Sequence, residues 1–224
     1  MGSSTMEKEV FFLGGDRYHP PEVAFSGVGA VLEELGLEVE YTADWTALSA
    51  DTLATKKLLV ILRDGMNWPN GFDREHVKWM SGDQQQAIWD FVQAGGAFLP
   101  LHNAQGYYPA GGLYYELFGG DYGGHPAPAI YSVEVVDADH PITAGVENYK
   151  IYDEQHMVKY YLGPEHELLR TVSTNGEEAT GGWWRESGQG RLVYLSMGHT
   201  PESFAHVMTK RLLTNALRWC LKLD

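Results

Sequence analysis

Short apolar runs that alternate with helical patterns organise the first hundred residues of the chain. Val10–Leu13, Leu58–Leu62 and residues 97–101 are continuously apolar, which is typical of buried parallel strands. Helical patterns cover residues 21–35, which open on a proline pair, and residues 81–94, which open on a serine cap and end at two glycines. This alternation predicts an α/β protein with a mainly parallel sheet and right-handed crossovers.

The second half of the chain has a less regular pattern, and we expect it to add extra strands to that sheet. A last amphipathic helix is predicted from Glu202 to Leu221, because apolar side chains such as Phe204, Leu212 and Trp219 fall on one face. The remaining expected strands are residues 37–41, 129–136, 168–172, 182–184 and 191–195.

Length, composition and charge narrow the class of protein. With 224 residues and 44% hydrophobic content, the chain can bury one substantial core, so we expect a single domain over residues 1–224. Residues 1–5 are interpreted as an added or disordered tail, and Met6 as a native start. A net charge of −14 argues against nucleic acid or an anionic membrane as partner. No apolar run is long enough for a membrane span, and with one cysteine we expect a cytoplasmic protein.

Polar residues follow three of the apolar runs and are the first candidates for a functional site. Asp16 and His19 come after the first run, His102 and Asn103 after the run at 97–101, and His199 after the last. Because the carboxyl ends of parallel strands meet at one edge of a sheet, we expect these side chains to converge there. A single loop histidine is more often hydrogen-bonded or solvated, so the convergence carries the hypothesis.

Two further segments carry candidate catalytic or metal-ligating residues. The glycine-dense stretch 119–126 brings His125, although such a loop is as consistent with a simple turn. Asp153, Glu154 and His156 follow a short apolar segment and are either a solvated acidic loop or a source of a general base or metal ligand. Imidazoles with a carboxylate suit zinc or a softer transition metal, and a zinc ion with an open position activates water. Aromatic side chains near these loops, which suit either a sugar face or the core, include Tyr107, Tyr122 and Trp184.

These residues together resemble the ThuA-like, or trehalose-utilisation, family, which is built on the class I glutamine amidotransferase-like fold. The resemblance rests on the order of Gly-Gly-Asp with His19, Leu-His at 101–102, His-Pro at 125–126, Asp-Glu at 153–154 and Gly-His at 198–199. It implies a flavodoxin-like three-layer fold and a role in sugar catabolism on a disaccharide or a keto-glycoside.

The resemblance also limits the chemistry. The related amidotransferases carry a cysteine nucleophile at the sharp turn after the central strand, where this chain has His102, and Cys220 falls in the last helix. An imidazole cannot form the thioester intermediate, so glutaminase activity is not implied. Glu202 lies three residues after His199, one more than in the amidotransferase pattern, and is equally consistent with a helix-capping role.

We therefore expect an enzyme that cleaves, eliminates from or isomerises a small carbohydrate. Its histidines are expected either to hold a divalent metal such as zinc as cofactor or to act as acid/base groups. The alternatives are a non-catalytic carbohydrate-binding or regulatory module and a structural metal site. An exposed aromatic loop at 66–69 is consistent with either the pocket mouth or a contact in a homo-oligomer. The expected catalytic residues are His102, Glu154, Asp153 and His199. The expected metal ligands are His102, His125 and His199. The expected substrate-binding residues are His19, Asp16, Asn103, Tyr107, Tyr122, His156 and Trp184.

Overall fold

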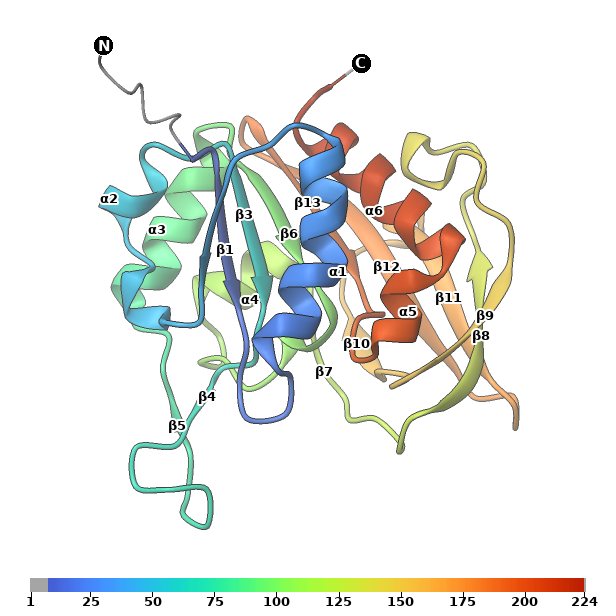
Figure 1. Cartoon of the computed structure of the whole chain (residues 1–224), viewed down its shortest axis with the longest axis horizontal. Coiled ribbons are helices and arrows are strands. Elements are labelled where there is room, and N and C mark those ends of the chain that lie inside the picture. Colours follow the sequence, from blue (N-terminus) through green and yellow to red (C-terminus); the bar gives the residue numbers. More distant parts are fainter. Residues whose placement is uncertain (1–7, 224) are drawn as a thin grey trace.

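A nine-stranded mixed sheet forms the centre of the molecule in the computed structural model, which describes residues 8–223 (Figure 1). Its first five strands are parallel, and the remaining four continue the sheet in antiparallel fashion. The parallel strands, in spatial order, are β2 (Val39–Thr42), β1 (Val10–Gly14), β3 (Leu58–Leu62), β6 (Ala97–Pro100) and β13 (Gly190–Leu195). The antiparallel strands are β12 (Glu178–Ser187), β11 (Glu167–Ser173), β8 (Ala129–Val135) and β9 (Tyr149–Asp153). The α/β, flavodoxin-like fold with extra strands in the second half is thus confirmed.

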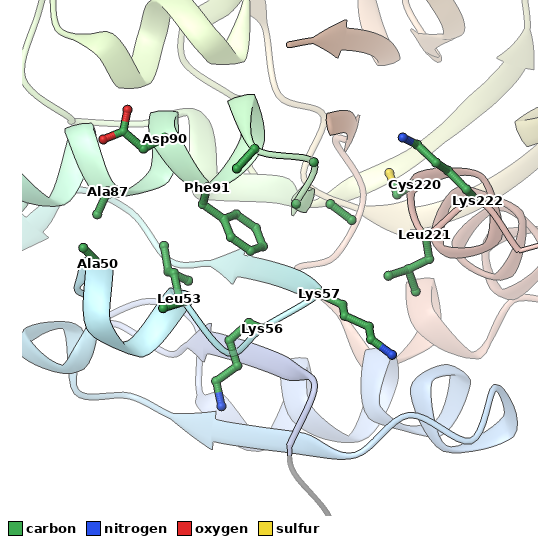
Figure 2. A pocket seen from close by; sticks show the side chains of 15 residues that line it. Ala50, Leu53, Lys56, Lys57, Ala87, Asp90, Phe91, Cys220, Leu221 and Lys222 are labelled. Carbon is green, nitrogen blue, oxygen red and sulfur yellow. The ribbon is translucent and has the colours of Figure 1, made fainter. Parts of the chain in front are cut away.

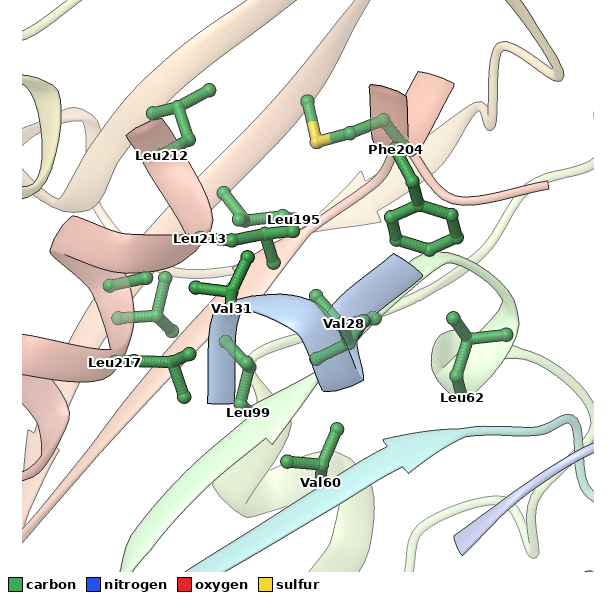
Figure 3. Close-up of a cluster of buried hydrophobic side chains, with 14 of the residues drawn as sticks. Val28, Val31, Val60, Leu62, Leu99, Leu195, Phe204, Leu212, Leu213 and Leu217 are labelled. Atoms are coloured by element: carbon green, nitrogen blue, oxygen red, sulfur yellow. The ribbon is translucent and has the colours of Figure 1, made fainter. Parts of the chain in front are cut away.

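Helices cover both faces of the parallel part, which gives the three layers. One face packs against α1 (Pro21–Glu34), α5 (Pro201–Ala205) and α6 (Val207–Cys220). The other packs against α2 (Ala50–Leu53), α3 (Gly82–Gln93) and α4 (Leu113–Phe118). Figure 3 shows the first core, where Val28 and Val31 of α1 meet Leu213 of α6 above the strand residues Val60 and Leu99. The fully buried strands β1, β3 and β6 contribute alternate side chains to the two cores, so none of these three has a polar face.

Local signals explain where the main helices begin. Ser81 accepts a hydrogen bond from the backbone N–H of Gln84, and the Gln84 side chain accepts one from the N–H of Ser81, so α3 opens on a capping box. The continuous helix expected from Glu202 to Leu221 is wrong. His206 has extended backbone angles and caps α6 by accepting from the N–H of Met208, which separates α5 from α6.

The structure also has short strand pairs and 3-10 turns that the pattern does not predict. A narrow two-stranded arm protrudes beside the sheet, and a second small pair lies near the antiparallel half (Figure 1). These pairs are β4 (Met66–Asn67) with β5 (Val77–Lys78) and β7 (Gly120–Tyr122) with β10 (Val158–Tyr160). The 3-10 turns are η1 (Trp45–Ala47), η2 (His102–Gln105), η3 (Pro141–Thr143) and η4 (Pro164–His166).

Two expectations concern the extremities and the membrane. The tail proposed for residues 1–5 lies outside the described residues. Among the helices of residues 8–223, none combines the length and apolar character that crossing a bilayer requires.

Candidate functional site

Loops that follow β1, β3, β6 and β13 surround a cavity of about 630 Å³ at the carboxyl edge of the parallel strands. Such an edge is where open α/β sheets bind ligands. The residues that line the cavity are Tyr18, His19, Asp64, Met66, Trp68, His76, Asn103, Gly106, Tyr107, Tyr122, His125, Glu154, His156 and His199.

His102 occupies the sharp turn directly after β6, and its position is tightly defined. Its side chain is fully buried, and its φ of 47° lies in the left-handed region that non-glycine residues rarely adopt. The ring Nδ1 lies 2.8 Å from the carbonyl oxygen of Ser196, whereas Nε2 has no hydrogen-bond partner. Gly198 packs so closely that a Cβ there would lie 3.3 Å from the Cβ of His102. The turn therefore presents one free ring nitrogen in a fixed direction.

His19 is oriented in the same way by Asp16. Its Nδ1 lies 2.8 Å from Asp16 Oδ1, and Asn103 donates from Nδ2 to Asp16 Oδ2 at 2.5 Å. Burial acts to raise the pKa of Asp16, but the hydrogen bond and charge of His19, with two backbone N–H groups, hold it at about 2. Burial also lowers the pKa of His19, which favours the neutral ring, and its Nε2 has no hydrogen-bond partner.

Glu154 is the common neighbour of four histidines. Its Oε2 lies 3.4 Å from Nε2 of His102, 3.4 Å from Nε2 of His156 and 3.2 Å from Nδ1 of His199, and its Oε1 lies 3.7 Å from Nδ1 of His125. Burial acts to raise the pKa of Glu154, but the neighbouring ring nitrogens hold it well below its ordinary value. Glu154 in turn raises the pKa of His199, while burial and the charge of His102 lower that of His156.

The ligand atoms fall into two groups that share Glu154. In the first, one ring nitrogen each from His19, His102 and His199 and a Glu154 oxygen all lie within 4.8 Å of one another. In the second, His125 and His156 join the same carboxylate. The expected metal set is thus divided, because His102 and His199 share a group and His125 belongs to the other.

The first group has the surroundings that metal-ligating histidines have in proteins. Such a ring donates its second N–H to a carboxylate or backbone carbonyl, which fixes the tautomer and points the other nitrogen at the ion. Asp16 does this for His19 and the Ser196 carbonyl for His102, while Nδ1 of His199 lies 3.2 Å from Glu154 Oε2. These residues therefore fit a divalent metal of the zinc type.

Asp153 has a different environment from its neighbour Glu154. Its side chain is fully buried, and its oxygens accept hydrogen bonds from the backbone N–H groups of Gly198, His199 and Thr200 at 2.8, 3.0 and 3.2 Å. The carboxylate thus ties the end of β9 to the loop after β13, which carries His199.

Of the seven expected substrate-binding residues, five line the cavity, whereas Asp16 lies behind His19 and Trp184 lies elsewhere. Asn103, Tyr107 and Tyr122 line it, and burial raises the pKa of Tyr122 to about 12. Trp184 does not reach the cavity. It packs against the core on the side of the sheet that α1 and α6 cover, and it stacks on His140 with ring centroids 5.0 Å apart.

Asp64 is a cavity residue that we did not predict. It follows β3, and so stands at the same edge as Asp16 and His102, which is the signal that could have identified it. Its Oδ1 accepts from the N–H of Met66. Burial and the negative charge of Asp16 raise the pKa of Asp64 to about 7.

A second cavity, of about 520 Å³, lies at the opposite ends of the strands, between α2, α3 and the end of α6 (Figure 2). Its charged side chains already have partners. Lys56 lies 2.7 Å from Glu40, Lys57 pairs with Glu9, and Lys222 donates to the carbonyl oxygen of Gln189 at 2.8 Å. Cys220, buried in the wall of this cavity, has its pKa raised by burial, and it is far from a nucleophile's position at the turn after β6.

Comparison with known proteins identifies the family. The model of the ThuA family, described as trehalose utilisation, matches residues 10–220. The chain therefore belongs to the ThuA family, and the expected family is confirmed. No curated protein matches the chain.

Solved structures show the same fold. A ThuA-like protein from Bacteroides uniformis is 18% identical, with a TM-score of 0.71 over 100% of this chain and 96% of that one. A ThuA-like protein from Parabacteroides merdae is 16% identical, with a TM-score of 0.72 over 95% of this chain and 88% of that one. A β-galactosidase from Rahnella is 14% identical, with a TM-score of 0.66 over 97% of this chain and 32% of the enzyme.

Proposed function

We propose that this ThuA-family protein is a divalent-metal-dependent enzyme that acts on a small carbohydrate such as a disaccharide or a keto-glycoside. The observation that carries the proposal is the group of ring nitrogens from His19, His102 and His199 that lie, with a Glu154 oxygen, within 4.8 Å of one another beside a cavity. The family description supports a sugar substrate. A cytoplasmic location is supported by a structurally similar Salmonella typhimurium protein that is itself called cytoplasmic, 13% identical with a TM-score of 0.59 over 95% of this chain and 98% of that one.

The position of the cavity supports a catalytic rather than a purely structural metal site. Four protein ligands close a tetrahedral structural zinc site, so a catalytic ion held by the three histidines and Glu154 needs a further coordination position for water or substrate, as five-coordinate zinc has. His19, Glu154 and His199 all line the cavity, so a metal held by them adjoins the space that a sugar would fill. A bound divalent ion supplies Lewis acidity that polarises a carbonyl or hydroxyl oxygen of the substrate.

The residues of the chain then take distinct roles. Glu154, whose pKa is held low, serves better as a ligand than as the proton-transferring base that the sequence suggested. Asp153 holds the loop that carries His199 and so acts as a positioning residue. The carboxyl of Asp64 lines the cavity and, with a pKa of about 7, can give or take a proton near neutral pH. Tyr107 and Tyr122 offer ring faces and hydroxyls to a sugar.

Elemental analysis of the purified protein, combined with a turnover screen on glucosides and keto-glucosides, tests this proposal. We expect a bound transition metal and turnover that chelation removes and metal restores. The variants His102→Ala and His199→Ala should each lose metal and at least 100-fold in kcat/KM, while the control His166→Ala, altered in η4, retains both.

The rival functions give different results. Sugar binding without turnover would indicate a non-catalytic binding or regulatory module. Metal that supports folding but leaves sugar turnover and binding unaffected would indicate a structural site. A folded His102→Ala protein with full metal and full activity would contradict the assignment.

A further inference from the structure

Two histidines on the outer side of Glu154 are not needed for the metal site proposed above. His125 reaches the cavity from the loop after β7, and His156 from the loop after β9. Together with the Glu154 carboxylate they form a group whose ligand atoms lie within 4.8 Å of one another, and no histidine of the first group belongs to it. One carboxylate therefore stands between two sets of imidazoles.

His156 is built into the fold as firmly as His102. It is 2% exposed, and its Nδ1 lies 2.5 Å from Nε2 of Gln105, whose Oε1 is buried without a partner. Turning this side-chain amide over places Oε1 against Nδ1, where it accepts the ring N–H and resolves the unpaired oxygen. Nε2 then carries the lone pair, 3.4 Å from Glu154 Oε2. This is the orientation that Ser196 gives His102.

Ring spacing fits two ions rather than one. The His102 and His156 rings lie side by side and are tilted, with centroids 4.0 Å apart and an interplanar angle of 32°. Nε2 of each ring is 3.4 Å from the same Glu154 oxygen. In two-metal sites the ions are separated by about 3.5–4 Å. The 4.0 Å between the two ring centroids is of the same size, so each ring can serve an ion of its own. The His125 ring continues the stack on His156, at 5.0 Å and 18°.

We propose that His125 and His156 hold a second divalent ion, which shares the Glu154 carboxylate with the ion of the first group. This inference rests on the proposed function, because it assumes that the first site binds metal. It also narrows the substrate. Two neighbouring ions favour a sugar that presents two adjacent oxygen atoms, such as a vicinal diol or an α-hydroxy ketone, because one oxygen can face each ion.

Metal stoichiometry tests the proposal directly. The full chain, stripped with a chelator and titrated with Zn²⁺ or Co²⁺, should bind two ions per chain by elemental analysis and calorimetry. His125→Ala alters a partly exposed ring, and His156→Gln keeps a polar side chain in the buried position. Each variant should bind one ion, and the stripped proteins should keep a native circular dichroism spectrum. The control His76→Ala changes a cavity histidine outside both groups and should still bind two.

The outcomes separate this inference from the proposed function. One ion in the unaltered protein, lost on His199→Ala but kept on His125→Ala, would overturn the second site and leave the first intact. Two ions that persist in both His125→Ala and His156→Gln would overturn the assignment of these ligands. No bound ion would overturn the metal dependence itself, and the second site with it.

Discussion

The side chains that carry the site are fixed through atoms that do not face the cavity. Asp16 holds His19, the Ser196 carbonyl holds His102, and backbone N–H groups hold Asp153. Each of these contacts removes rotational freedom from a residue before any ligand arrives. The strained backbone of His102 belongs to the same arrangement, since left-handed φ values in non-glycine residues persist where the surroundings enforce them.

The raised pKa of Asp64 predicts that this residue affects the stability of the protein in a pH-dependent way. Folding raises its pKa from 3.8 to about 7, so its contribution to stability is present below pH 3.8 and is lost as the pH rises through 7. In metal-free protein at pH 8, Asp64→Asn should therefore increase the free energy of unfolding by about 4 kcal/mol, and at pH 4 by less than about 1 kcal/mol. Urea denaturation at the two pH values measures this.

The exposed Asp73, on the neighbouring arm, provides the control. Asp73→Asn should change the free energy of unfolding little at either pH. An equal effect of Asp64→Asn at pH 4 and pH 8 would contradict the raised pKa of Asp64.

The regular elements could be predicted from the sequence to the extent that local signals set them. β3 matches its apolar run, and α3 follows its capping box, because burial on both faces and a serine cap leave a clear pattern. The break between α5 and α6 depends on a His206 side chain acting as a cap, which the apolar periodicity does not reveal. The alternation of side chains along β12 does not show which face of the sheet Trp184 lies on. Its position away from the cavity, against His140, could therefore not be predicted.

Site residues that follow regular strands could likewise be predicted from the sequence, whereas those in irregular loops could not. His19, His102 and His199 were predicted to meet because each follows a parallel strand, and topology alone brings those strand ends together. His125 and His156 come from irregular segments after β7 and β9, whose positions depend on the antiparallel half. Sequence spacing places His156 beside Glu154, but it does not bring His125 to them.

Asp153 links β9 to the loop after β13, so its removal should affect both the stability of the fold and the position of that loop. Asp153→Ala leaves three buried backbone N–H groups without their acceptor, so the free energy of unfolding should fall by about 2–4 kcal/mol. Because that loop carries His199, metal affinity should fall as well. Chemical denaturation and metal titration measure the two effects.

Asp139→Ala, at an exposed turn, is a matched control that should alter neither quantity. Loss of stability in Asp153→Ala with unchanged metal affinity would show that Asp153 supports the fold without positioning His199.

At the scale of the whole molecule, one continuous sheet joins the parallel and antiparallel halves. β13 pairs with β6 on one side and β12 on the other, and two extensive cores cover the parallel part. The single domain expected from length and composition predicts that metal-free protein unfolds in one cooperative transition, with equal calorimetric and van't Hoff enthalpies. Two separable transitions by calorimetry and fluorescence would argue for two units instead.

The cavity is lined from segments that follow both the first and the last strand of the parallel half. A molecule that contacts both His19 and His199 therefore links two segments of the chain that separate when the sheet unfolds. By mass action, what occupies this cleft raises the melting temperature in proportion to the logarithm of its concentration. Thermal shift thus becomes a means of ranking candidate sugars and ions without knowledge of the reaction.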